Sequence, residues 1–161
     1  MFERFFPDMI VEGFEDIDLE LLKKNKIKGL ILDIDNTIVP WNEMTGNYRA
    51  KDWINMLINE GFDVCLVSNS NKKRVEQFSM ILGLRGIHNA VKPFKRGFLK
   101  ACDIMNIKPE QAAVVGDQIF TDIYGGNRLK MFTILVKPIS EKDFILTKFK
   151  RIFEKIVLSK K

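Results

Sequence analysis

Short apolar runs alternate along the chain with segments in which apolar residues recur at helical spacing. The apolar runs, bounded by turn residues, predict five buried strands at residues 28–35, 62–67, 88–91, 112–117 and 131–136. The helical spacing predicts helices between these strands, at residues 52–60, 72–82, 98–105 and 119–129. Because strands and helices alternate strictly, we expect an α/β fold with a doubly wound parallel sheet and helices on both faces.

Length and composition narrow the class of protein. The 161 residues suit one domain, 1–161, and an apolar content of 46% excludes an intrinsically disordered chain. The two cysteines, Cys65 and Cys102, are set among apolar residues and indicate no disulfide framework. No apolar run approaches the roughly 20 residues of a membrane span. We therefore expect a soluble, cytoplasmic protein.

The positive charge of the chain is concentrated at its C-terminus. The formal net charge is +5, and residues 137–161 contain eight basic and three acidic residues, so this segment carries the whole excess. The neutral body argues against a nucleic-acid partner, whereas the C-terminus leaves a local contact with an anionic surface open. Within it, residues 143–158 predict a basic amphipathic helix that either packs on the sheet or lies on an anionic membrane.

Polar side chains follow four of the predicted strands. They are acids, a hydroxyl, an amide and a lysine: Asp33, Asp35, Ser68, Asn69, Lys92 and Asp117. In a doubly wound sheet the carboxyl ends of the strands form one edge, and ligands bind there. Buried carboxylates that lie side by side need a compensating cation, and oxygen ligands suit a hard divalent ion such as Mg²⁺. We therefore predict a magnesium site at this edge.

Four segments, in order, resemble the motifs of the haloacid dehalogenase-like (HAD) phosphohydrolases. Residues 33–37 read D-I-D-N-T, residues 66–69 end an apolar strand in Ser-Asn, residues 91–93 contain Lys92, and residues 116–122 read G-D-Q-I-F-T-D. One such motif is weak, whereas four in order on strand ends are specific. Motifs one and four, with the opening Phe6-Pro7-Asp8, look most like HAD subfamily IIIA, which includes the YqeG-type phosphatases and the related mitochondrial phosphatidylglycerophosphate phosphatases.

The resemblance implies a phosphomonoester hydrolase with an aspartyl-phosphate intermediate. Asp33 would be the nucleophile, and Asp35 would act as general acid and then general base. Mg²⁺ would be held by Asp33, the backbone carbonyl of Asp35 and Asp117, while Asp122 would orient a metal-bound water or Lys92.

Further residues are implied to bind the substrate phosphate. Thr37, Ser68, Asn69 and Lys92 would surround the phosphoryl oxygens, where charge lies in the transition state. Each motif also has an ordinary structural explanation. Turn formation and helix capping account for the Asp-Asn-Thr and Ser-Asn segments, and Lys92 could be a solvated loop lysine.

The substrate class is less specific in the sequence. The predicted elements leave no room for an inserted cap domain, and capless HAD enzymes tend to act on large or surface-displayed phosphates. With the basic C-terminal helix and the apolar Phe2, Phe5 and Phe6, this favours a lipid phosphate such as phosphatidylglycerophosphate, with the enzyme peripheral at an anionic membrane. A soluble phosphorylated metabolite or protein is the alternative. Trp41 either lines the pocket or packs on the core.

Two non-catalytic alternatives remain. A receiver-like signalling module also has paired acids after its first strand, but it needs a phospho-accepting Asp at the strand end where this chain has Lys92. A silent phosphate-binding scaffold would usually have lost Asp33 or Asp35, and both are present. A homo-oligomer finds no support in the sequence.

Overall fold

A six-stranded parallel sheet forms the centre of the protein, with strand order β1-β6-β5-β2-β3-β4. This is a computed structural model, and it describes residues 2–40 and 48–139. The strands are β1 (Met9–Val11), β2 (Gly29–Leu32), β3 (Asp63–Val67), β4 (Arg85–Ile87), β5 (Ala112–Gly116) and β6 (Phe132–Val136). From β2 the chain runs outward through β3 and β4, and then crosses to the other side of β2. This topology confirms the predicted doubly wound sheet and makes β2 the switch point, where ligands bind in such folds.

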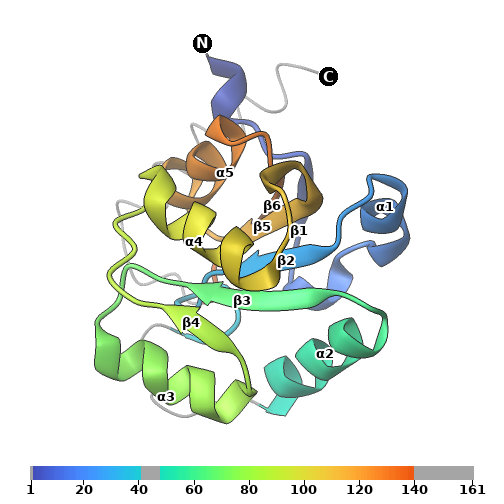
Figure 1. Ribbon diagram of the computed structural model, residues 1–161. Helices are drawn as coiled ribbons and strands as arrows, with labels where there is room; N and C mark the ends of the chain where they lie inside the picture. Colours follow the sequence, from blue (N-terminus) through green and yellow to red (C-terminus); the bar gives the residue numbers. More distant parts are fainter. Residues whose placement is uncertain (1, 41–47, 140–161) are drawn as a thin grey trace.

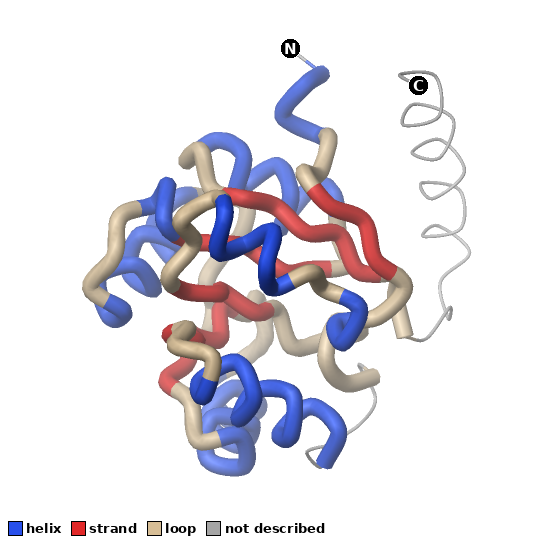
Figure 2. The backbone as a smooth tube through the Cα atoms, turned by 90° about the vertical axis from the view of Figure 1, so that its right-hand side faces the viewer, coloured by secondary structure: helices blue, strands red, loops and turns tan. Residues whose placement is uncertain are grey.

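Helices cover both faces of the sheet (Figure 1; Figure 2). They are α1 (Leu19–Lys24), α2 (Tyr48–Asn59), α3 (Lys72–Leu82), α4 (Lys95–Met105) and α5 (Tyr124–Arg128). Short helical turns join them: η1 (Phe2–Phe5), η2 (Phe14–Asp16), η3 (Pro109–Gln111) and the π-helical turn η4 (Ile119–Ile123). On one face Leu22, Leu57 and Phe78 bring α1, α2 and α3 onto the sheet. On the other face Phe98 and Met105 anchor α4.

The register of the central strands aligns their carboxyl ends. Leu32 of β2 lies opposite Leu66 of β3 and Val115 of β5, so the three strands end at nearly the same level. The Asp33 amide donates to the carbonyl of Val115 at 3.0 Å, which extends this alignment one residue past β2. The residues that follow these strands are therefore brought to one edge, as the sequence predicted.

The short strand next to β3 lies earlier in the chain than predicted. The apolar pattern indicated residues 88–91, whereas β4 is Arg85–Ile87. Asn89 and Val91 have φ angles of 46° and 54°, which no strand can accommodate. A Cβ at Gly86 would lie 2.7 Å from Val75 Cγ1 of α3. Close packing of helix on strand therefore accounts for this glycine.

Three further features complete the comparison with the sequence. The edge strand β1, which pairs with β6, was not predicted. The helix expected at 119–129 begins as the π-helical turn η4 and continues as α5. Trp41 and the predicted helix at 143–158 lie outside the described residues. Within residues 2–40 and 48–139, no helix combines the length and apolar character needed to cross a membrane.

Candidate active site

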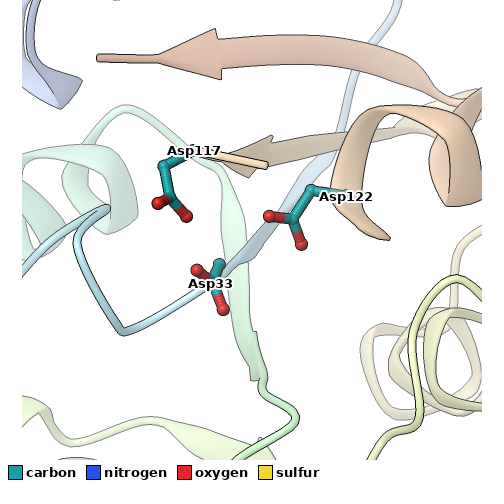
Figure 3. Close-up of side chains that lie close together, drawn as sticks. All are labelled: Asp33, Asp117 and Asp122. Atoms are coloured by element: carbon teal, nitrogen blue, oxygen red, sulfur yellow. The ribbon is translucent and has the colours of Figure 1, made fainter. Parts of the chain in front are cut away.

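Three aspartates converge at the carboxyl edge of the sheet (Figure 3). Asp33 directly follows β2, Asp117 directly follows β5, and Asp122 lies in η4. One carboxylate oxygen of each lies within 4.8 Å of the others, and all three residues are buried. Acids from positions up to 89 residues apart in the chain thus form one cluster. It contains Asp33 and Asp117, the two side chains that the sequence analysis predicted to bind Mg²⁺.

Lys92 is the cation of this cluster in the structure. Its Nζ lies 2.9 Å from Asp33 Oδ1 and 2.7 Å from Asp122 Oδ1, and only 3% of its side chain is exposed. Asn69 holds the lysine loop in place, because its Oδ1 accepts from the Lys92 amide at 2.7 Å and its Nδ2 donates to the Lys92 carbonyl at 3.3 Å. The Asn69 side chain therefore positions Lys92 from the neighbouring strand end.

Thr37 is placed differently from what its expected phosphate contact requires. The residue is completely buried, and its Oγ1 lies 3.1 Å from Asp33 Oδ2 and 3.3 Å from Asp117 Oδ1. The hydroxyl can donate to one of these carboxylates at a time, so it bridges them without reaching solvent. In this structure Thr37 orients the two aspartates, and its side chain is not part of the surface that a substrate would meet.

Gly116 allows Asp122 to enter the cluster. A Cβ at position 116 would lie 2.2 Å from Asp122 Oδ2, closer than any real contact, so a side chain here would displace the carboxylate. The Gln118 amide then donates to Asp122 Oδ2 at 3.4 Å. π-Helical turns such as η4 often occur at functional sites. Contact with Asp122 thus explains why the fourth motif has a glycine at position 116.

Asp35 is held by two residues that the sequence analysis missed. Its Oδ2 accepts from Ser70 Oγ at 2.7 Å, and its Oδ1 lies 2.8 Å from Nε and 2.6 Å from Nη2 of Arg74. Arg74 lies in the first turn of α3, and its guanidinium also stacks over the Phe78 ring at 5.0 Å. The Ser-Asn-Ser-Asn run before α3 predicted the start of this helix. Nothing in the run indicated that Arg74 would pair with Asp35, which lies 39 residues earlier in the chain.

A cleft of about 230 Å³ opens over the cluster. Five of the predicted site residues line it: Asp33, Asp35, Ser68, Asn69 and Lys92. Ser70, Gln118 and Thr121 complete the lining and were not predicted. The Ser68 hydroxyl, which is almost fully buried, accepts from the Ser70 amide at 3.0 Å. Asp117, Asp122 and Thr37 lie outside this lining.

Two acids of the cluster hold their protons more tightly than exposed acids do. Burial, together with the nearby carboxylates of Asp33 and Asp122, raises the pKa of Asp117 to about 9. Burial also raises the pKa of Asp122 to about 6, although Lys92 acts in the opposite direction. Burial would lower the pKa of Lys92, but the carboxylates of Asp122 and Asp33 outweigh it, so the pKa is raised and the ammonium stays charged. Without a metal ion, Asp117 therefore holds a proton at neutral pH, and a divalent cation that binds here would have to displace it.

The residues present fit a divalent metal ion. Asp117 Oδ2 is buried and has no hydrogen-bond partner among the described residues, although a buried carboxylate oxygen normally has one. Oxygen ligands suit hard cations, and two positive charges would balance the cluster. Asp33 and Asp117, with Asp122 behind them, would hold the ion.

The fold and the site together define the class. A doubly wound parallel sheet that collects aspartates and a lysine at its carboxyl edge is the architecture of the HAD superfamily, and a family model that matches residues 2–140, together with a phosphatase relative at 40% identity, makes the chain an HAD-type phosphatase. A solved p-nitrophenyl phosphatase from Archaeoglobus fulgidus shares the fold, with a TM-score of 0.56 over 78% of this chain and 92% of that chain, at 15% identity. Asp33 and Asp117 directly follow β2 and β5, as the motifs indicated, whereas Lys92 lies in the loop after β4 and Asp122 lies in η4.

Sequence comparison gives the particular family. The family model described as mitochondrial PGP phosphatase matches residues 2–140, and the chain belongs to this family. The probable phosphatase YqeG of Bacillus subtilis (strain 168) is 40% identical over 160 residues, which are 99% of this chain and 93% of that protein. Phosphatidylglycerophosphate phosphatase 1, chloroplastic/mitochondrial, of Arabidopsis thaliana is 27% identical over 91% of this chain and 45% of its own length.

Proposed function

We propose that the protein is a Mg²⁺-dependent phosphomonoester hydrolase that works through an aspartyl-phosphate on Asp33. The observation that carries this proposal is the buried cluster in which Asp33 contacts Lys92 at 2.9 Å and shares Thr37 with Asp117. A carboxylate held at the floor of a cleft, next to a buried ammonium, is oriented to attack a phosphorus atom that enters from the cleft.

The residues of the cleft have separate roles in this proposal. Asp33 attacks phosphorus, and the leaving oxygen takes a proton from Asp35, which then removes a proton from the water that hydrolyses the acyl phosphate. The Lys92 ammonium and the Ser68 hydroxyl neutralise phosphoryl oxygens as their charge redistributes in the transition state. Ser70 and Arg74 fix the Asp35 carboxylate at the wall of the cleft. Mg²⁺, when bound, supplies charge neutralisation between the nucleophile and the phosphoryl group.

For the substrate we propose a lipid phosphate such as phosphatidylglycerophosphate, with the enzyme peripheral at an anionic membrane. Membership of the family and the printed name of the Arabidopsis relative support this choice. The cleft is lined by polar and charged side chains, which suit the phosphate group itself. A soluble phosphorylated metabolite or protein is the second candidate.

Replacement of the nucleophile tests the chemistry. Asp33→Asn should lower phosphate release from p-nitrophenyl phosphate in the presence of Mg²⁺ by roughly 10⁴-fold or more, while the circular dichroism spectrum stays that of the wild type. Asp103→Asn, at an exposed acid of α4, is the matched control and should retain full activity. Substantial turnover by the Asp33 variant would refute the proposed mechanism.

A substrate panel tests the lipid assignment. Phosphatidylglycerophosphate in mixed micelles should be hydrolysed with a higher kcat/KM than soluble phosphomonoesters of sugars, nucleotides and phosphopeptides. A soluble compound that exceeds the lipid by this measure would overturn the lipid assignment and leave the phosphatase chemistry intact.

A further inference from the structure

The loop that carries Lys92 has two exposed apolar side chains. Lys92 points into the site, whereas Val91 is 58% exposed and Phe94 is 64% exposed. Phe120, which is 51% exposed, lies two residues before Asp122 in η4. We call Val91, Phe94 and Phe120 the apolar rim. The Phe120 ring also packs edge-on against Phe5, with ring centroids 5.7 Å apart. Exposed large apolar side chains on segments that also carry functional residues are typical of surfaces that bind a partner or a membrane.

The members of the apolar rim belong to two segments that pack together. Lys92 Nζ lies 2.7 Å from Asp122 Oδ1, which joins the lysine loop to η4. Farther along, a Cβ at Gly125 would lie 3.3 Å from Pro93 Cα, so the backbones of the two segments are in close contact. The same ion pair that builds the floor of the site therefore fixes the rim around it.

Folding requirements do not explain the residue types at two of these positions. Val91 has a φ angle of 54°, a region that a β-branched residue adopts only with strain. Phe94 occupies the N-cap of α4 without a side-chain hydrogen bond, where Ser, Thr, Asp or Asn would stabilise the helix. Both residues thus contribute apolar surface at positions where a polar residue would fit the backbone better.

Basic residues occupy the first turns of α3 and α4. Lys95 and Arg96 are exposed in the first turn of α4, and Lys72 and Lys73 are exposed in the first turn of α3. Neither first turn contains an acid, although the helix dipole favours acids there and disfavours bases. The N-termini of both helices follow the carboxyl ends of β3 and β4, so these charges lie at the edge of the sheet that holds the cleft. Lys95 and Arg96 directly follow the exposed Phe94, and positive charge next to an exposed apolar side chain complements an anionic bilayer.

We propose that the apolar rim and the basic first turn of α4 dock the enzyme on an anionic phospholipid bilayer, with the cleft facing the lipid head groups. Val91 and Phe94 enter the interfacial layer, while Lys95 and Arg96 pair with anionic head groups. This inference rests on the proposed function for the identity of the substrate, but vesicle binding can be measured without any turnover.

The test variant is designed to fold at least as well as the wild type. Val91→Asn combined with Phe94→Ser places a residue that tolerates positive φ at 91 and a favoured N-cap residue at 94. Met80→Ser is the matched apolar control, since Met80 is 84% exposed near the C-terminal end of α3, away from the cleft. For charge, Lys95→Gln with Arg96→Gln is compared with Lys24→Gln and Lys108→Gln, which change two exposed lysines elsewhere.

Binding of the full chain is measured by co-sedimentation with vesicles of equal parts phosphatidylglycerol and phosphatidylcholine, and with vesicles of phosphatidylcholine alone. The wild type should bind the anionic vesicles only. The Val91/Phe94 variant should bind roughly tenfold more weakly or worse, and loss of the two α4 charges should weaken binding by about 25-fold at low salt. The Met80 and Lys24/Lys108 controls should bind like the wild type.

Two results would overturn the proposal: no binding of the wild type to anionic vesicles, or equal binding by the wild type and the Val91/Phe94 variant. Hydrolysis of p-nitrophenyl phosphate by each variant separates this outcome from failure of the proposed function. All of the rim variants should keep the wild-type rate on this soluble substrate. Absence of that activity in the wild type would refute the phosphatase chemistry, whatever the vesicles show.

Discussion

Replacement of Lys92 by methionine tests how the buried charges of the site are balanced. Methionine keeps most of the apolar stem and removes only the ammonium, which contacts Asp33 at 2.9 Å and Asp122 at 2.7 Å. The side chains of these two partners are 11% and 2% exposed, so water cannot replace the lost contacts. Lys92→Met therefore leaves Asp33 and Asp122 without their cation in the metal-free protein.

The expected loss of stability is large. Removal of one partner of a buried ion pair typically costs about 3–5 kcal/mol. We expect the lower end, about 3 kcal/mol, because Asp122 can become protonated once the lysine no longer opposes the effect of burial on its pKa. For a chain of this length each kcal/mol corresponds to about 2–4 °C in Tm, so the melting temperature should fall by roughly 10 °C.

The assay is urea unfolding at pH 7 with EDTA, followed by circular dichroism. Lys23→Met is the matched control, because Lys23 Nζ lies 2.7 Å from Glu60 in an ion pair whose side chains are 39% and 45% exposed. Exposed pairs contribute little, so this variant should unfold like the wild type. Lys92→Met combined with Asp122→Asn should recover part of the loss, since it removes one uncompensated charge. If the free energy of unfolding of Lys92→Met lies within about 1 kcal/mol of that of the wild type, the buried ion pairs of Lys92 do not stabilise the fold as proposed.

Two further predictions concern the metal and Thr37. Mg²⁺ at 100 times its dissociation constant should raise the free energy of unfolding of the wild type by about 2.7 kcal/mol in the same assay. This stabilisation should be absent in Asp117→Asn. Equal stabilisation of both proteins would mean that the ion binds elsewhere. Thr37→Val should lower metal affinity or kcat by about 10–100-fold, because it removes the hydrogen bond that orients Asp33 and Asp117. Thr37→Ser keeps the hydroxyl and should stay close to the wild type. A valine variant with unchanged metal affinity and kcat would refute this role.

The positions of the polar strand ends could be predicted because the fold itself determines them. A buried strand that ends in Asp33 and another that ends in Asp117 must bring these residues to one edge once the sheet is parallel. The aligned register of β2 and β5 is the only further requirement, and the structure meets it. The spacing of apolar residues predicted the strands, and the HAD-like motifs predicted the order of the site residues along them. Neither step required knowledge of side-chain contacts.

Contacts that depend on tertiary geometry were not accessible in this way. The ion pair of Arg74 with Asp35 joins a loop to a helix that has no local reason to carry an arginine there. The sequence predicted that Thr37 contacts the phosphate, because nothing in a turn-like motif indicates that its side chain is buried behind the two aspartates. The position of β4 was mispredicted because the apolar pattern at residues 88–91 does not reveal the positive φ angles of Asn89 and Val91.

The charge distribution of the site has a consequence for how its ligands bind. A phosphomonoester that enters the cleft brings negative charge toward Asp33, Asp117 and Asp122, while Lys92 is already engaged by two of them. The divalent cation proposed above would offset this repulsion. The binding of cation and phosphate would then be coupled, and the factor by which the cation strengthens phosphate binding would also be the factor by which phosphate strengthens cation binding. Because this coupling would arise at the carboxylates that hold the ion, neutralisation of Asp33 or Asp117 should reduce it as well as lower affinity for the cation.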